Sequence, residues 1–352
     1  MGKATIEDKE VAWKVLDVTI HGTISAPTDK AASSAVVFMA GSGPTDRNWC
    51  SPVLPGTNGS AKILAEELAS QGFATLRFDK IGSGPHVKKD LPKFVGKVSM
   101  QTHLDELVGA VETLLSERDI DNDNLFALTN SEGAIHVVNY QLQSERRRFK
   151  GLVLTGAPGR AIGEVARSQI FNQAKSLHDA ESFMKLYDEA IAKFLASKPI
   201  VIDPSFPEAI RPFLRSLENP NNLPFSRELW TYSLPDYIAK VDEPMLVLIG
   251  KKDIQIDWKI DGGALERATA QKTRVSFAYP ENANHVLKHE ETPKDKLTAQ
   301  DVGLHYNAPD AELDQESADA IYAWLKKQRD YETALTAWSG LTPALRTMRP
   351  PK

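Results

Sequence analysis

The chain has little of several features that would place a protein in a class at once. Its 352 residues include one cysteine, Cys50, so no disulfide can form within the chain. No catalytic pattern surrounds Cys50, and we expect a structural thiol. No apolar run approaches the roughly 20 residues that cross a bilayer. The net charge of −5 gives no electrostatic reason to expect nucleic acid or an anionic membrane as a partner.

The first ten residues are polar and lack the apolar core of a secretory signal, so we expect a cytoplasmic protein. Hydrophobic residues make up 41% of the chain and charged residues 25%, which is enough apolar material to bury a substantial core. The length is near the upper end for one domain that carries an insertion.

Hydrophobic patterning predicts an α/β fold with a mostly parallel sheet and helices on both faces. Residues 11–25 alternate between apolar and polar, as antiparallel strands do. Later strands are nearly continuous apolar runs separated by helical spacing, which is typical of parallel strands buried on both faces. The candidate central strands are 35–39, 74–78, 125–129, 152–155, 245–249 and 273–278, and the candidate helices are 61–70, 104–115 and 134–142. Ligands bind such sheets beyond the carboxyl ends of the strands.

One of these apolar runs breaks at Ser131 and resumes with helical periodicity. This pattern predicts a strand, a sharp turn and a helix, which would project the Ser131 hydroxyl from the carboxyl edge of the sheet. The segment Thr129-Asn130-Ser131-Glu132-Gly133 has the second glycine of the pattern G-x-S-x-G but threonine in place of the first. The alternative is that Ser131 only caps the helix that follows.

Two further residues follow Ser131 in the order that acyl chemistry needs. Asp253 stands just past an apolar run that ends in glycine, and His285 lies in a loop before a short apolar segment. A serine hydroxyl is a weak nucleophile, so His285 would take its proton as general base. Asp253 would orient the imidazole and stabilise its charged form. Asp257 is the alternative acid, although its position is typical of the start of a helix.

A glycine-rich turn follows the predicted strand 35–39. The backbone of Gly41, Ser42 and Gly43 can direct N–H groups toward a ligand. We expect the N–H groups of Ser42 and Glu132 to form an oxyanion hole. A phosphate-binding loop fits less well, because the lysine and hydroxyl residue of such a loop do not follow Gly43.

Four segments together resemble the serine hydrolases of the α/β-hydrolase superfamily and are similar to its prokaryotic esterase branch. They are residues 41–47, 77–84, 130–133 and the loops that hold Asp253 and His285. The resemblance implies an α/β-hydrolase fold with an inserted helical cap, and a triad in the chain order nucleophile, acid, base. It also implies loop-bracing roles for Arg77 and Asp79. Thr129 and Ala40 depart from the family pattern, in which a glycine and often a histidine stand there.

The rhythm of the sequence changes between Gly159 and about Pro235, where no strong strand pattern occurs and apolar residues recur at helical spacing. We therefore expect a hydrolase core at 1–160 and 235–330, a helical cap at 161–234 and a C-terminal tail at 331–352.

Substrate contacts are expected from Gly41, Gly43 and Trp49 around the serine and from Phe183 and Tyr187 in the cap. The alternative for the two cap aromatics is that they only pack the cap onto the core.

His285 and His289 are four residues apart, a spacing that can place two imidazoles on one helical face, but the H-E-x-x-H pattern of zinc proteases is absent. We expect no metal and no cofactor.

The predicted function is hydrolysis of a small-molecule carboxylic ester through an acyl-enzyme. An acyl transferase, a thioesterase or a peptidase with the same triad is an alternative, because the pocket selects the leaving group. Another alternative is a non-catalytic ligand-binding protein on the same fold. The C-terminal tail is either partly disordered or packed against another subunit in a homodimer, and the sequence leaves both alternatives.

Overall fold

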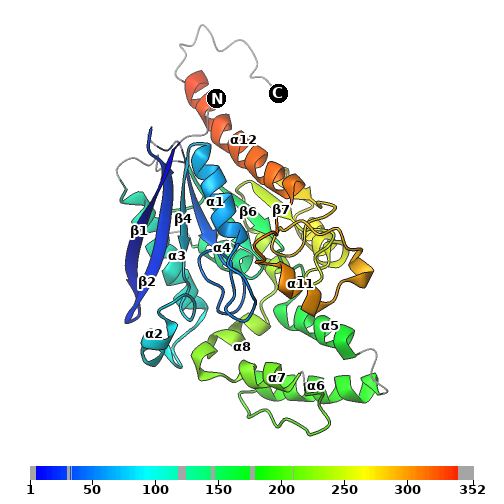
Figure 1. The fold of residues 1–352 in the computed structure, drawn as a ribbon. Helices are drawn as coiled ribbons and strands as arrows, with labels where there is room; N and C mark the ends of the chain where they lie inside the picture. The colour runs from blue at the N-terminus through cyan, green and yellow to red at the C-terminus, as the bar shows by residue number, and fades with distance from the viewer. Residues whose placement is uncertain are drawn as a thin grey trace.

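The computed structural model describes residues 5–29, 32, 34–117, 124–143, 147–174, 179–208 and 210–339. Figure 1 shows a twisted sheet with helices packed against it and a further group of helices beyond one end of the sheet. The layers follow from the alternation of strands and helices along the chain, because each apolar sheet face must be covered.

Eight strands form one sheet in the order β1-β2-β4-β3-β5-β6-β7-β8. The strands are β1 (Ile6–Val15), β2 (Val18–Pro27), β3 (Ser34–Met39), β4 (Phe73–Phe78), β5 (Leu125–Asn130), β6 (Gly151–Thr155), β7 (Met245–Leu248) and β8 (Val275–Ala278). β2 pairs antiparallel with β1 and β4, and all other neighbours are parallel. The predicted antiparallel start, parallel sheet and central strands are confirmed.

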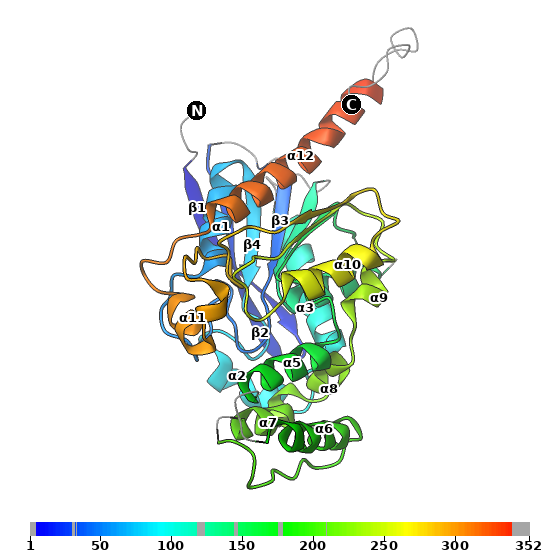
Figure 2. The same ribbon diagram turned by 90° about the vertical axis from the view of Figure 1, so that its right-hand side faces the viewer.

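Helices cover both faces of this sheet (Figures 1 and 2). On one face, α1 (Ser60–Ser70) and α12 (Gln315–Ser339) pack on alternate strand residues such as Phe38. On the other, α3 (Met100–Leu115) and α4 (Gly133–Gln141) do the same. The helix predicted at 104–115 begins four residues earlier, because Ser99 and Thr102 form a capping box that starts α3 ahead of its apolar stripe. A shorter helix, α2 (Val87–Phe94), follows β4.

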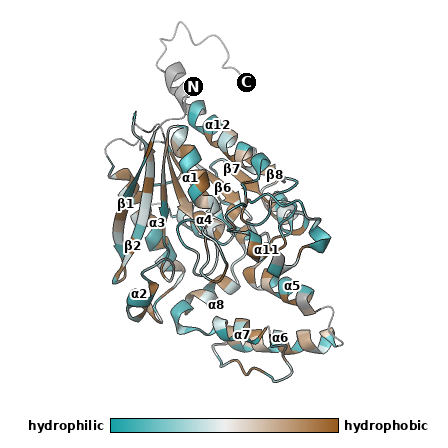
Figure 3. Ribbon diagram, in the orientation of Figure 1, coloured by the Kyte–Doolittle hydropathy of each residue, from teal (hydrophilic) through white to brown (hydrophobic). Residues whose placement is uncertain are grey.

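The segment between β6 and β7 is helical, as predicted. It contains α5 (Ile162–Ala174), α6 (Ala180–Leu195), α7 (Arg211–Leu217), the 3₁₀ turn η1 (Pro220–Asn222), α8 (Phe225–Trp230) and α9 (Leu234–Ile238). Helices α5 to α8, which we call the helical insertion, lie beyond the end of the sheet in both views. They share an apolar cluster of their own that includes Phe194 and Trp230. Figure 3 shows hydrophilic and hydrophobic residues along α6 and α7, as expected for helices with one buried face.

After β7 come η2 (Trp258–Gly262), α10 (Gly263–Ala268), β8, η3 (Lys294–Lys296), α11 (Ala299–His305) and α12. Because α12 continues to Ser339, the first part of the tail predicted at 331–352 is helical, and residues 340–352 lie outside the described residues. Within the described part of the chain, no helix is both long enough and apolar enough to cross a membrane.

Cys50 is buried near the start of α1. Burial raises the pKa of this thiol to about 12, so that it stays protonated at neutral pH. A protonated, buried thiol fits the structural role expected from the sequence.

Candidate active site

Ser131 stands at the turn between β5 and α4, at the carboxyl edge of the sheet. Its φ of 54° lies in the left-handed region that residues other than glycine rarely adopt. The Ser131 N–H donates to Thr155 O (2.8 Å), and the Ala134 N–H donates to Ser131 O (3.0 Å). Ser131 does not cap α4, since Glu132 occupies the N-cap position. The half-buried serine therefore has the strained turn that exposes a nucleophile above a parallel sheet.

The residues around this turn explain its sequence. A Cβ on Gly133 would lie 2.5 Å from Met39 O, so only glycine lets α4 approach the end of β3 so closely. Thr129 takes the place of the other glycine without leaving its hydroxyl unsatisfied, because Thr129 Oγ1 donates to Val153 O (3.3 Å). Thr155 Oγ1 donates to Thr129 O in return (2.6 Å). Hydrogen bonds between β5 and β6 thus accommodate the threonine that replaces the first glycine of G-x-S-x-G.

His285 and Asp253 form a buried pair. The distance between His285 Nδ1 and Asp253 Oδ2 is 2.7 Å, and the two side chains are 5% and 1% exposed. The other carboxylate oxygen of Asp253 accepts the N–H groups of Gln255 (2.7 Å) and Ile256 (2.9 Å), which fixes its orientation. Asp257 has a different partner set, since it caps η2 through the N–H groups of Lys259 and Ile260. The geometry favours Asp253 over Asp257 as the partner of the histidine.

Two residues that the sequence did not single out hold His285 near the turn. Asn130 Nδ2 donates to the backbone oxygen of His285 (2.8 Å). A Cβ on Gly156, which has a φ of 56°, would lie 3.1 Å from His285 Cε1. No hydrogen bond joins the Ser131 hydroxyl to His285 among the described residues, and such bonds often tighten only when substrate binds. The sequence feature that could have identified Asn130 is its position directly before the serine.

The predicted oxyanion turn lies against Ser131. A Cβ on Gly41 would lie 3.1 Å from Ser131 Cβ, and Gly43 has a φ of 75°. Within the described residues, no protein acceptor takes the backbone N–H of Ser42 or of Glu132. An oxyanion hole needs such a pair of backbone N–H groups, without protein acceptors, beside a serine side chain.

The three aromatic residues that were predicted to contact substrate are buried in the structure. Trp49 is 3% exposed and packs against Phe38, with ring centroids 6.0 Å apart. Phe183 and Tyr187 are buried in the apolar cluster of the helical insertion, where Phe183 meets Phe206 edge to face. Helical spacing located these residues on a buried face, and that face packs within the insertion. Packing, the alternative considered from the sequence, describes their placement better than substrate contact.

The side chain of Glu132 turns away from solvent into a buried polar cluster. Its Oε1 lies 3.0 Å from His136 Nε2 and 3.4 Å from Lys80 Nζ. Burial opposes ionisation of Glu132, but the Lys80 ammonium and the His136 hydrogen bond together hold its pKa well below the usual range. Burial, helped by the nearby His103, lowers the pKa of His136 to about 4, so His136 is neutral at pH 7 and donates to the carboxylate.

A cavity of about 920 Å³ lies on the aspartate side of this site. It is bounded by α5, the loop after β7 that holds Asp253, and the segment from η3 to α11. Its cationic lining residues Arg160, Arg167 and Lys294 are each paired with an aspartate. The apolar lining residues include Phe171, Ile254 and Tyr306. The volume matches that of small-molecule sites.

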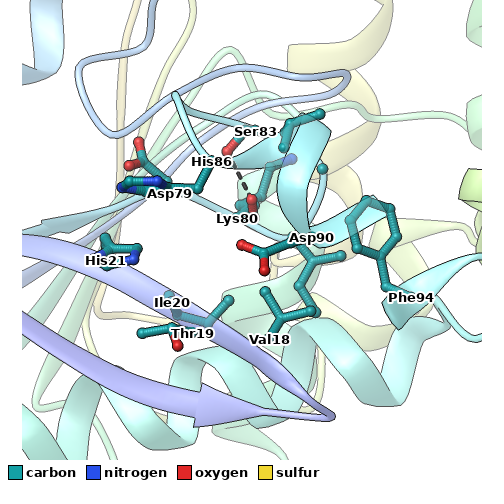
Figure 4. A pocket seen from close by; sticks show the side chains of 13 residues that line it. Val18, Thr19, Ile20, His21, Asp79, Lys80, Ser83, His86, Asp90 and Phe94 are labelled. Carbon is teal, nitrogen blue, oxygen red and sulfur yellow. Dashed lines mark hydrogen bonds between the residues drawn. The ribbon is translucent and has the colours of Figure 1, made fainter. Parts of the chain in front are cut away.

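A second cavity, shown in Figure 4, lies between β2, the loop after β4 and α2. His21 and His86 face each other there with ring centroids 4.3 Å apart, beside Asp79 and Asp90. Its volume of about 20 Å³ admits one water and no substrate. Across the described residues, no group of three or more His, Cys, Asp or Glu side chains is arranged to hold a metal ion.

No family model matches the sequence, and no curated protein is significantly similar to it. Solved structures are similar over most of the chain. A proline iminopeptidase from Mycobacterium smegmatis is 16% identical, the match covers 92% of this chain and 100% of that one, and the TM-score is 0.55. An esterase from Pyrococcus furiosus is 14% identical, with coverages of 92% and 93% and a TM-score of 0.52. An acylaminoacyl peptidase from Pyrococcus horikoshii is 16% identical, with coverages of 92% and 42% and a TM-score of 0.53.

These similarities and the strand order show that the chain has the α/β-hydrolase fold. Identities this low define the fold and leave the chemistry to the site. The expected fold class is confirmed.

The neutral state of buried His136 predicts a pH dependence of stability. Its pKa in the folded state, about 4, is below the unfolded value near 6.5, so the unfolded chain binds more protons between these pH values. The free energy of unfolding therefore falls as the pH drops from 6.5 to 4. In His136→Gln, which keeps a donor for Glu132, we expect this fall to be shallower by up to about 1.4 kcal/mol per pH unit.

Urea unfolding at pH 7, 6, 5 and 4 measures the two slopes. The control is His305→Gln, which removes an exposed histidine that lies 3.8 Å from Glu290 and so measures the effect of losing a surface histidine. Equal slopes for wild type and His136→Gln would contradict a neutral buried His136.

Proposed function

We propose that the protein is a serine hydrolase that cleaves carboxylic esters through an acyl-enzyme. The observation that carries this proposal is the convergence, at one edge of the sheet, of a strained serine turn, two undonated backbone amides and a buried histidine–aspartate pair. The α/β-hydrolase fold of esterases and peptidases supports the coarser assignment as a hydrolase.

In the proposed reaction, Ser131 Oγ attacks the ester carbonyl carbon while His285 Nε2 takes the hydroxyl proton. The carbonyl oxygen becomes an anion between the N–H groups of Ser42 and Glu132. Asp253 keeps the imidazole oriented through Nδ1 and stabilises its positive charge. The C–O bond to the alcohol then breaks, and the alcohol leaves with the proton from His285. Water attacks the acyl-enzyme by the same route and releases the acid.

For the substrate, we propose a small-molecule ester with an uncharged acyl group of small to medium size. The cations that line the 920 Å³ cavity already have aspartate partners, so an anionic acyl group would find no free counter-ion there. The helical insertion would act as the cap that roofs the site. A closing cap contributes by positioning the ester and excluding water.

Amide hydrolysis is the second candidate, since two structurally similar proteins are peptidases. The same groups would serve it, with His285 protonating an amine as leaving group. Rates on matched ester, thioester and amide substrates with one acyl group separate the candidates, and we expect the ester to react fastest.

We expect Ser131→Ala to abolish ester hydrolysis and labelling by a serine-directed phosphonate while it keeps the fold. Loss of a triad member typically lowers kcat by several orders of magnitude. Mass spectrometry of the labelled wild type should find the adduct on the Ser131 peptide. An adduct on Cys50 or on another serine would overturn the assignment.

Asp253→Asn and Asp257→Asn form a matched pair in one loop. Since Asp253 contacts His285 and Asp257 caps η2, we expect kcat to fall by about 10⁴-fold in the first variant and by less than tenfold in the second. Turnover of a chromogenic ester gives both values. A larger loss in Asp257→Asn would reverse the choice of acid.

Alanine variants of Phe171 and Phe183 distinguish a role in substrate specificity from a role in packing within the insertion. Phe171 is 46% exposed and lines the cavity, whereas Phe183 is 6% exposed. We expect Phe171→Ala to shift the preferred acyl length at nearly unchanged stability. Phe183→Ala should cost about 3 kcal/mol or more of unfolding free energy and leave the acyl preference unchanged. Thermal unfolding and an acyl-length series on both variants provide the measurement, and the reverse result would return Phe183 to the substrate site.

A further inference from the structure

Lys80 is a buried charged residue without a step in the proposed reaction. It follows β4 and is 4% exposed. Its ammonium donates a 2.6 Å hydrogen bond to Gly41 O and lies 3.4 Å from Glu132 Oε1. A lysine is rarely buried this completely unless its charge is paired.

Both contacts of Lys80 end on the two segments that supply the proposed oxyanion donors. The carbonyl of Gly41 and the N–H of Ser42 belong to the same peptide unit. Because a peptide unit is planar and trans, a bond that fixes its oxygen also fixes the direction of its N–H, on the opposite side. A donor on the oxygen also polarises the unit and strengthens the N–H as a donor. Lys80 therefore orients and polarises the Ser42 amide through the oxygen on the opposite side of the peptide unit.

The second contact concerns charge. Glu132 is 2% exposed, and its own N–H is the other proposed oxyanion donor. An uncompensated carboxylate there would oppose the negative charge that forms on the substrate oxygen. The Lys80 ammonium offsets it, whereas His136 is neutral and supplies only a hydrogen bond.

Buried side chains pack around the partners of Lys80 on this side. His136 and His103 lie with ring centroids 4.6 Å apart, and Phe225 of α8 packs edge to face on His103 at 4.4 Å. His103 Nδ1 in turn lies 2.7 Å from Glu106 Oε2. All of these side chains are buried. The ion pair lies in a buried, low-dielectric surrounding, where its effect on nearby charge is large.

We propose that Lys80 is the positioning residue of the oxyanion hole: it aims the Gly41–Ser42 peptide unit at the reacting carbonyl and neutralises Glu132 behind the second donor. This inference rests on the proposed function, since it assigns Lys80 to that same site.

The test compares wild type with Lys80→Met, using kcat and KM for a chromogenic ester and the inhibition constant of a trifluoromethyl ketone. The ketone adds to the serine and forms an oxyanion that mimics the transition state. Loss of one oxyanion donor costs about 10²–10³-fold, so a misaimed donor should cost roughly 10- to 100-fold. We expect kcat/KM and ketone affinity to fall by the same factor, with KM changed by less than about threefold.

Lys288→Met is the matched control. Lys288 is also buried, and its ammonium donates to the backbone oxygen of Ala311 (3.0 Å), which lies outside the oxyanion turn. Loss of stability without loss of ketone affinity is expected for this variant. Equal ketone affinity in Lys80→Met and wild type would overturn the proposal.

A double variant keeps the proposal testable if Lys80→Met does not fold. Lys80→Met combined with Glu132→Gln removes both charges, and neutral replacement of a buried pair is often tolerated. The Gly41 oxygen still lacks its donor in this protein, so ketone affinity should stay reduced at least fivefold. Wild-type affinity in the double variant would rule out aiming by Lys80.

Phosphonate labelling of the same preparations separates this inference from the proposed function. If wild type is labelled at Ser131 but the Lys80 variants bind the ketone normally, only the role of Lys80 fails. If wild type is not labelled at Ser131, the proposed function fails as well.

Discussion

The arrangement of the site depends on the left-handed backbone turn at Ser131. A residue with a side chain is strained in this conformation and stays there only when its surroundings over-determine it. Here Thr155 of β6 accepts its N–H, Gly133 lets α4 approach the end of β3, and Gly41 lets the proposed oxyanion turn touch the serine side chain. Because β3, β5 and β6 are neighbours in the sheet, their carboxyl ends lie at one edge, and these close approaches set how near the following turns lie to one another. The constraint that strains the turn is therefore also the one that assembles the site.

A second constraint is the buried carboxylate directly after the serine. Burying a charge is costly unless it is paired and hydrogen-bonded, and Glu132 has both kinds of partner in Lys80 and His136. Since His136 is neutral at pH 7, the Lys80 ammonium is the charged partner of the Glu132 carboxylate beside the proposed oxyanion hole. Stability at acid pH and the electrostatics of the site are thereby linked through the same few side chains.

Much of this could be predicted from the sequence because it is local or periodic. Continuous apolar runs located the parallel strands, and the break at Ser131 located the turn. The position of Asp253 just past a strand end agreed with its contact to His285. Trp49, Phe183 and Tyr187 were predicted to contact substrate, and the structure buries all three. For Phe183 and Tyr187, helical periodicity shows that a face is buried but not what buries it. The pair Lys80 and Glu132, 52 residues apart, had no sequence signal of its own, since it arises only when β4 and β5 end at the same edge.

The proposed chemistry requires that Ser131 is the nucleophile and that the amides of Ser42 and Glu132 receive the oxyanion. A crystal structure of the phosphonate-inhibited protein tests it most directly. We expect a bond between phosphorus and Ser131 Oγ, with one phosphoryl oxygen about 2.7–3.1 Å from both amide nitrogens. A phosphoryl oxygen turned away from both amides, or phosphorus bonded to another residue, would contradict it.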